Sequence, residues 1–167
     1  RALHAHCSRW DIEVLFARAD DIPAWTADGA VDAAVAGRDQ IIEAAAEVDE
    51  LVPLGFGRCA LEVAVPAAGA IAEVGALDGG RVATAHPRTA AAFFAAEGLA
   101  VETVPIRGSV ELAPRLDAAD GIVDLVSSGD TLRQNGLRSI ATVLESEATL
   151  VARREDLVLE TTVQGDD

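Results

Sequence analysis

Apolar and polar residues alternate along this chain in short segments, and their spacing predicts alternating strands and helices. From Cys59 to Val65 every second residue is apolar, which is the pattern of a strand with one buried face. From Pro87 to Gly98 the apolar residues, Phe93 and Phe94 among them, follow helical spacing instead, and a glycine closes the segment. The pattern therefore predicts both kinds of element, and each is short.

The other predicted elements fill the rest of the chain. Strands are expected at residues 12–16, 31–36, 51–54, 81–85, 101–106, 121–126, 140–144 and 149–151. Four more helices are expected: one that Asp21 caps, one at residues 40–48 that Asp39 caps, a brief one opened by the turn at residues 108–114, and one that begins at Thr131. This alternation predicts an α/β fold with helices packed on mainly parallel sheets, and the Ala- and Gly-rich stretch 66–80 is the expected seam between two lobes.

The stretch from Ala119 to Leu132 carries the pattern in which we expect the chemistry. Residues 121–126 are an apolar run broken only by Asp124, and small, hydroxylated and glycine residues follow at once, namely Ser127, Ser128, Gly129, Asp130 and Thr131. A tight loop that opens a helix offers free amides, hydroxyls and a closely approachable backbone, which together bind a phosphate. Asp124 is placed to accept hydrogen bonds from the hydroxyls of a sugar that carries this phosphate. An ordinary strand-to-helix turn explains the same residues equally well, because the pattern is less specific than a P-loop.

The charge of the chain argues against one class of partner. The 167 residues include 28 acidic and 13 basic side chains, all of the latter arginine, and the net charge is −15. A nucleic-acid-binding surface is not expected on so acidic a chain. Two explanations of the acidity stay open, a GC-rich genome and a salty cytosol. We favour the second, which predicts that salt raises the midpoint of unfolding.

Further features of the composition favour a cytoplasmic protein without a membrane partner. No apolar run reaches the roughly 18 residues that span a bilayer, and no secretory leader is visible. Cys7 and Cys59 are the only cysteines and are expected to be reduced thiols. Beside Cys7, His4 and His6 complete a cluster that could bind a metal. A frayed polar terminus is the simpler interpretation, so no metal ligand is predicted.

Several short motifs along the chain occur in the order of one known family. They are Asp21-Ile22-Pro23, Val31-Asp32 with Gly37-Arg38-Asp39, Leu-Gly-Phe-Gly-Arg-Cys at 54–59, Arg-Val-Ala-Thr at 81–84 with Pro87, Gly-Ser-Val-Glu-Leu-Ala-Pro at 108–114, and the stretch 119–132 with Asn135-Gly136-Leu137. In this set and order the chain resembles the ATP phosphoribosyltransferase family, which catalyses the first step of histidine biosynthesis. The resemblance covers nearly the whole chain, and the last motif is the most diagnostic.

The resemblance implies a two-lobed α/β fold of the type II periplasmic-binding-protein kind, in which the chain crosses twice between the lobes. Lobe one is expected at residues 1–63 plus 148–167, on the side of ATP and pyrophosphate. Lobe two is expected at residues 64–147, where phosphoribosyl pyrophosphate binds. The implied substrates are ATP and phosphoribosyl pyrophosphate with Mg²⁺, and the implied reaction is attack of adenine nitrogen 1 on the anomeric carbon with release of pyrophosphate.

The resemblance also implies roles for individual residues. Expected to bind substrate are Asp124, Ser127, Ser128, Gly129, Asp130, Thr131, Leu132, Gly37, Asp39 and Arg18, and expected to act in catalysis are Glu111, Arg38 and Arg58. The loop residue Asp130 is expected to offer its amide while its carboxylate turns to solvent or to an arginine. Glu111 is the acidic candidate near Mg²⁺, although a plain role in a helical turn explains it nearly as well. No nucleophilic side chain is required, because positioning and charge neutralisation supply most of the rate.

Two parts of the family pattern have no counterpart here, which leaves alternatives open. The family's opening strand is missing before Arg1, and the histidine-binding C-terminal domain of the long form is missing after Asp167. The chain also contains no methionine, so a natural start upstream is expected. A homo-oligomer, or a short form in complex with a histidyl-tRNA-synthetase-like regulatory subunit, is expected. The alternative functions are a non-enzymatic small-anion-binding module of the same fold and an inactive paralogue.

Overall fold

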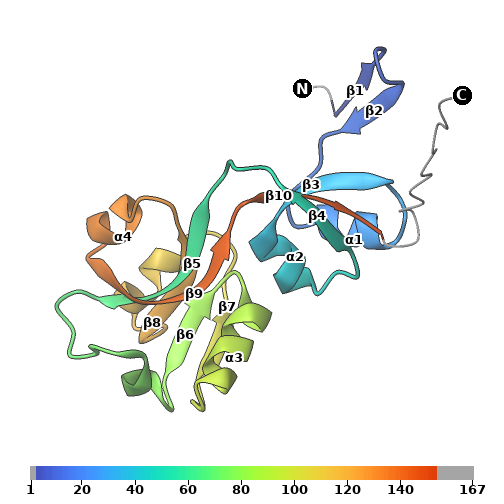
Figure 1. Cartoon of the computed structure of the whole chain (residues 1–167). Helices are drawn as coiled ribbons and strands as arrows, with labels where there is room; N and C mark the ends of the chain where they lie inside the picture. Colours follow the sequence, from blue (N-terminus) through green and yellow to red (C-terminus); the bar gives the residue numbers. More distant parts are fainter. Residues whose placement is uncertain (1–2, 154–167) are drawn as a thin grey trace, which may run out of the picture.

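Two sheets with their flanking helices form the two lobes of the computed structural model, which describes residues 3–153 (Figure 1). In lobe one the strand order is β3-β10-β4, with β3 at Ala33–Gly37, β10 at Ala148–Ala152 and β4 at Asp49–Pro53. Helices α1 (Ile22–Ala27) and α2 (Arg38–Ala44) accompany this sheet. Its small core consists of Ala36, Ile41 and Val151.

Lobe two is larger and contains a five-stranded sheet of order β7-β6-β8-β5-β9. The strands are β5 (Cys59–Pro66), β6 (Arg81–Thr84), β7 (Glu102–Pro105), β8 (Gly121–Val126) and β9 (Leu137–Ser146). The 3-10 helix η1 (Val74–Leu77) and helix α3 (Pro87–Ala96) contribute Leu77 and Phe94 to one core, with Leu61 and Val63 of β5. A second core gathers Ala64 and Ile122 with Val110 of the 3-10 helix η2 (Val110–Leu112) and Leu132 of helix α4 (Asp130–Gln134). The 3-10 helix η3 (Pro114–Leu116) follows η2 and buries none of its residues. Strand β5 is therefore buried on both faces, not on the one face that its alternation predicts.

The two-lobed α/β class is confirmed, but the predicted predominance of parallel strands is wrong. Among the strand pairs of residues 3–153, only β6-β7 and β6-β8 run parallel. Strand β5 runs antiparallel to both β8 and β9, and lobe one is antiparallel throughout. Alternating strands and helices suggested crossover units, but β5 in lobe two and β10 in lobe one, the strands that follow each passage between the sheets, run opposite to their neighbours.

The chain passes between the sheets just after β4 and again between β9 and β10. Strand β4 ends at Pro53 and β5 begins at Cys59, while β9 ends at Ser146 and β10 begins at Ala148. The expected division at residue 63 therefore falls inside β5, whereas the division at 148 coincides with the start of β10. The expected seam at residues 66–80 lies wholly within lobe two, because Leu77 anchors this Ala- and Gly-rich stretch in the core.

The structure also corrects two of the expected helices, α2 in its start and α4 in its length. Helix α2 begins at Arg38 with Gly37 as its N-cap, so Asp39 lies inside the first turn and does not cap it. Helix α4 has only five residues, because Gly136 at φ +69° follows it and Leu137 already starts β9. The helix at Thr131 is therefore shorter than its apolar spacing suggested.

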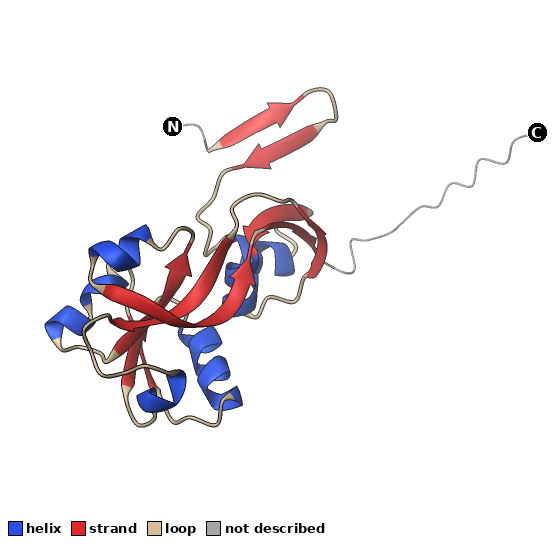
Figure 2. Ribbon diagram, turned by 60° about the vertical axis from the view of Figure 1, so that its left-hand side comes forward, coloured by secondary structure: helices blue, strands red, loops and turns tan. Residues whose placement is uncertain are grey.

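A hairpin of β1 (His4–Cys7) and β2 (Ile12–Leu15) stands away from both lobes (Figures 1 and 2). Its two strands pair antiparallel with each other and with no other described strand. Large apolar side chains remain exposed on it, including Leu3 (69%), Trp10 (66%) and Phe16 (54%). The polar terminus expected around His4 is thus an ordered but isolated hairpin.

Candidate functional site

The loop that follows β8 lines two adjoining hollows on lobe two. The larger, of about 420 Å³, is lined by Arg58, Cys59, Ala60, Glu62, Val126, Ser127, Ser128, Gly129 and Glu145. The smaller, of about 70 Å³, is lined by Asp124, Leu125, Val126, Ser127, Ser128, Gly129, Thr131 and Leu132. The sequence-predicted loop residues therefore meet at one place, at the end of β8.

The backbone of this loop turns sharply at Gly129. This glycine has φ +73°, a left-handed conformation that residues with a side chain adopt only with strain, and it is the N-cap of α4. The two serines and Thr131 beside it are exposed, whereas Leu132 is buried in the core and anchors the loop. Hydroxyls and amides are thus presented to solvent on a fixed support.

Asp130 is turned away from the hollow, as expected. Its carboxylate pairs with the Arg133 guanidinium and accepts a hydrogen bond of 2.8 Å from the Ser128 hydroxyl. The Ser128 hydroxyl and the Arg133 charge together hold the pKa of Asp130 below its usual value. This arrangement neutralises part of the negative charge that the aspartate brings to the loop.

Asp124 lies at the end of β8, directly opposite Glu62 of β5 in the strand register. Opposite residues in an antiparallel pair project from the same face of the sheet, so both carboxylates point toward the loop side. Burial raises the pKa of Asp124, and the nearby Glu111 charge raises it further, while the Leu125 amide, which donates to its carboxylate at 2.8 Å, acts in the opposite direction. Asp124 is therefore an acceptor in a partly desolvated position at the edge of the smaller hollow.

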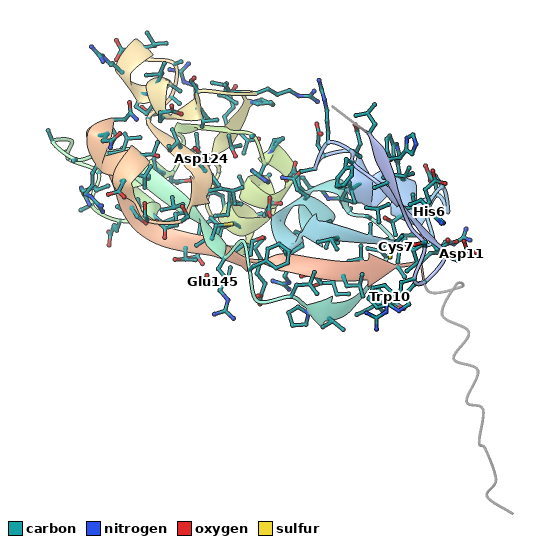
Figure 3. The ribbon with its side chains drawn as sticks, turned by 90° about the horizontal axis from the view of Figure 1, so that it is seen from above. His6, Cys7, Trp10, Asp11, Asp124 and Glu145 are labelled. Carbon is teal, nitrogen blue, oxygen red and sulfur yellow. The ribbon has the colours of Figure 1, made fainter. Side chains whose placement is uncertain are left out.

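Two acidic residues of the larger hollow were missed by sequence reasoning. Glu62 and Glu145 come from β5 and β9, and Figure 3 shows Glu145 and Asp124 in lobe two, far from the hairpin residues His6 and Trp10. Glu62 is one of the alternate residues of β5 that the apolar pattern placed on the exposed face of the strand. A carboxylate at such a position was the signal that could have located it. The pairing of β5 with both β8 and β9 brings these carboxylates to the loop.

Arg58 is the basic residue that lines the larger hollow. Its side chain is 75% exposed, and its Nε lies 3.5 Å from a carboxylate oxygen of Glu147. Arg38, the other arginine expected in catalysis, pairs instead with Glu50 at 3.3 Å and lines neither hollow. The structure therefore brings Arg58, but not Arg38, to the loop.

Asp39 is not available to a ligand, because other side chains use both of its carboxylate oxygens. One oxygen accepts from the Ser146 hydroxyl at 2.6 Å, and the other lies 2.8 Å from the Gln40 amide and 3.2 Å from Nε2 of His86. Burial alone would raise the pKa of Asp39, but the hydrogen bonds from His86, Ser146 and Gln40 outweigh it and lower the pKa to about 2. Asp39 is thus a structural acid between the lobes, and its expected role in substrate binding stays a prediction that this conformation does not favour.

The remaining expected residues lie away from the hollows. Arg18 is exposed in the segment before α1, where its carbonyl accepts the Asp21 amide. Gly37 leaves room for the Asp39 carboxylate, since a Cβ there would lie 2.5 Å from one of its oxygens. Glu111 lies on η2, which packs against β8, and its negative charge raises the pKa of Asp124.

The chemistry that this site can perform is recognition of an anion and of hydroxyl groups, without covalent catalysis. Burial and then the Asp39 charge raise the pKa of the Cys59 thiol, which makes it a poor nucleophile at neutral pH. Among residues 3–153 no three His, Cys, Asp or Glu side chains are grouped so as to hold a metal ion, those of His4, His6 and Cys7 included. No helix in this part of the chain is both long and apolar enough to cross a membrane.

Comparison with known proteins gives a consistent family. Residues 18–164 match the family described as ATP phosphoribosyltransferase. Proteins named ATP phosphoribosyltransferase from Methanopyrus kandleri and Haloarcula marismortui are 44% and 42% identical over 91% and 93% of this chain. The chain spans about half of the length of these curated relatives, 54% and 55%.

Solved structures share the fold. The ATP phosphoribosyl transferase (HisG:HisZ) complex from Thermotoga maritima superposes with a TM-score of 0.80 at 24% identity, covering 92% of this chain and 73% of that one. A putative periplasmic sulfonate-binding protein from Methylobacillus flagellatus superposes with a TM-score of 0.61 at 20% identity, covering 85% and 49%. These likenesses confirm the periplasmic-binding-protein-like fold, and with the family match they lead to one conclusion: the chain belongs to the ATP phosphoribosyltransferase family.

Proposed function

We propose that this chain forms the substrate-binding part of an ATP phosphoribosyltransferase, which transfers phosphoribosyl from phosphoribosyl pyrophosphate to nitrogen 1 of ATP and releases pyrophosphate. The observation that carries the proposal is the loop at residues 127–132. It presents exposed hydroxyls and amides around a left-handed glycine, and it lies within residues 18–164, which match the family.

In this proposal the loop holds the 5′-phosphate of phosphoribosyl pyrophosphate. The amides at Gly129 and Thr131 and the hydroxyls of Ser127 and Thr131 donate to phosphate oxygens. Asp124 accepts hydrogen bonds from the ribose hydroxyls, because it lines the smaller hollow beside the loop. Leu132 keeps the loop in place from within the core.

The acidic lining of the larger hollow decides how the pyrophosphate group must enter. Glu62 and Glu145, together with Asp124 of the adjoining smaller hollow, repel a bare polyanion, and Arg58 supplies one positive charge at the larger hollow. A magnesium complex of phosphoribosyl pyrophosphate reduces this repulsion, since Mg²⁺ binds mostly phosphate oxygens and waters and needs at most one or two protein carboxylates. Asp124 and Glu62, which face the same side of the sheet, fit that small requirement.

The reaction in this proposal is a direct displacement, for which the chain's residues position the reactants. Ser127, Thr131 and Asp124 fix the phosphoribosyl group, so that its anomeric carbon is turned toward the adenine. Arg58 neutralises charge on the departing pyrophosphate. Holding two reactants in line lowers the entropic part of the barrier, so that no side chain needs to form a covalent bond with substrate.

The proposal also assigns a substrate side to each lobe, with lobe one on the side of ATP and pyrophosphate and lobe two on the side of phosphoribosyl pyrophosphate. We place the protein in the cytoplasm, as a homo-oligomer or in complex with a regulatory subunit. The isolated hairpin supports association, because a two-stranded hairpin with exposed Leu3, Trp10 and Phe16 is only marginally stable by itself. The non-enzymatic anion-binding module is the competing function.

Thermal unfolding with different ligands tests the proposal. At equal concentration, magnesium phosphoribosyl pyrophosphate should raise the melting temperature more than ribose 5-phosphate does, because it makes more contacts with the site and has the lower Kd. A ligand at about a hundred times its Kd adds about 2.7 kcal/mol of stability. A control with Thr142→Val, which removes an exposed hydroxyl on β9 outside both hollows, should give the same shift as the unchanged chain. Equal shifts with phosphoribosyl pyrophosphate and inorganic phosphate would favour the anion-binding module.

A further inference from the structure

Helix α2 of lobe one and the start of α3 in lobe two meet at the junction between the lobes. The two helices contact each other, and α2 also contacts β9. In Figure 1 α2 is the part of lobe one that lies nearest to lobe two. The polar side chains of this contact come from α2 on one side and from residues 86–89 on the other.

Glu43 of α2 caps the N-terminus of α3. Its carboxylate accepts hydrogen bonds from the Arg88 amide at 3.0 Å, the Thr89 amide at 2.9 Å and the Thr89 hydroxyl at 2.8 Å. The first amides of a helix have no partner within the helix, and a carboxylate there is also favoured by the helix dipole. The N-cap residue of α3 itself, His86, makes no side-chain cap bond. The cap of this helix therefore belongs to the other lobe.

A second set of bonds crosses the same junction and is buried. Asp39 and Gln40 of α2 meet His86 of lobe two, with Nε2 of His86 3.2 Å from Asp39 and 3.0 Å from the Gln40 amide nitrogen. Ser146 at the end of β9 completes the set through its 2.6 Å bond to Asp39. The carboxylate can only accept, so His86 donates its Nε2 proton to Asp39. Nδ1 of His86 is buried and has no hydrogen-bond partner among the described residues.

We propose that α2 is a latch that fixes the angle between the two lobes, with Glu43 as its positioning residue. The Asp39 network lies close to the chain crossing at residue 147, where rotation displaces atoms little. Glu43 lies one helical turn further along α2 and accepts three hydrogen bonds from the start of α3 in the other lobe. A change of the angle between the lobes must first break these three bonds.

Paired labels on the two lobes test the latch without any ligand. Cysteines at Asp28, after α1, and at Glu97, after α3, carry spin labels in a chain with Cys7 and Cys59 replaced by serine. Both positions are exposed, and neither side chain belongs to the network. With Glu43 intact a single narrow distance distribution is expected. Glu43→Ala should broaden it or add a second distance, and Glu43→Gln, which keeps one acceptor oxygen, should recover part of the narrow population.

A matched control and a milder variant keep this test decisive. Glu47→Gln removes the same charge from an exposed neighbouring position and should leave the distribution unchanged. Thr89→Val removes one of the three bonds and should broaden the distance distribution less than Glu43→Ala does. If the Glu43→Ala chain does not fold, Thr89→Val still tests the latch. An unchanged narrow distribution in the folded Glu43→Ala or Thr89→Val chain would overturn the latch.

The effect on ligands rests on the proposed function and is measured separately. Ribose 5-phosphate needs only the loop of lobe two, so its Kd should be the same in the unchanged chain and in Glu43→Ala. Phosphoribosyl pyrophosphate with Mg²⁺ engages both lobes, and its Kd should rise about tenfold. If both ligands bind equally in the two chains while the label distances differ, the latch stands and the assignment of pyrophosphate to lobe one fails.

Discussion

The loop after β8 and the junction between α2 and α3 both concentrate polar groups, but they treat those groups in opposite ways. In the loop the Ser127 and Thr131 hydroxyls are exposed and make no described bond to another side chain. At the junction Asp39, His86 and Ser146 are at most 5% exposed and bond to one another. Polar groups left open around a left-handed glycine are suited to a ligand, whereas polar groups that satisfy each other hold the fold.

This contrast predicts that the junction dominates stability. Asp39→Ala removes the acceptor of three donors and leaves them buried without a partner, so the free energy of unfolding should fall by about 3 kcal/mol. Urea denaturation measures this value. Asp32→Ala, which removes an exposed carboxylate, should change it by less than about 0.5 kcal/mol. A small loss for Asp39→Ala would mean that the junction is not a cooperative part of the fold.

The junction should also make stability depend on acid. The pKa of Asp39 falls from 3.8 in the unfolded reference to about 2 in the folded chain. A carboxyl whose folded pKa is depressed stabilises the fold above its unfolded pKa, and this contribution disappears as pH falls through the folded value. The stability difference between the unchanged chain and Asp39→Asn should therefore shrink by about 2 kcal/mol from pH 5 to pH 2. A difference that stays constant over this range would contradict the depressed pKa.

The loop should behave in the opposite manner, with a large effect on binding and a small one on stability. Thr131→Val should weaken phosphoribosyl pyrophosphate binding by about 1–3 kcal/mol, because a phosphate oxygen loses its donor. Since Thr131 is exposed, the free energy of unfolding should change by less than about 0.5 kcal/mol. Calorimetric titration and urea denaturation separate the two effects. Unchanged affinity would remove this hydroxyl from the site.

The acidic lining of the larger hollow should produce the smallest effect. Glu145→Gln removes one exposed negative charge near the loop, so anion affinity should rise about twofold at low salt and less at 0.5 M salt, where charges are screened. Glu73→Gln, outside both hollows, provides the matched control. A fall in affinity would instead indicate that Glu145 takes part in binding, for example through a sugar hydroxyl.

The same contrast explains which features the sequence could predict. The strand at residues 121–126 and the loop after it depend on neighbours in sequence, so the apolar run and the residues Ser127 to Thr131 were enough to locate them. The partner of Asp39 is His86, 47 residues away, and Glu43 reaches Thr89 across 46 residues. Such pairs arise from the packing of two lobes and leave no local pattern, so the sequence pointed neither to the bonds of Asp39 across the junction nor to Glu43.

The errors about the sheets have a similar origin. Composition made residues 66–80 resemble a linker, although one buried leucine, Leu77, is enough to tie the stretch to lobe two. The strand at Cys59–Pro66 was correct as an element, but which strands it pairs with depends on residues 121–126 and 137–146. Glu62 and Glu145 enter the site only through that pairing, which no spacing along the chain reveals.

The most direct test of the central claim, that residues 127–132 bind the phosphate, is a titration followed by backbone amide NMR. Adding ribose 5-phosphate should shift the amide signals of this loop most strongly, above all those of Gly129 and Thr131, while the buried amides at Asp39 and Thr89 stay in place. Shifts of comparable size across both lobes, or none in the loop, would contradict the assignment.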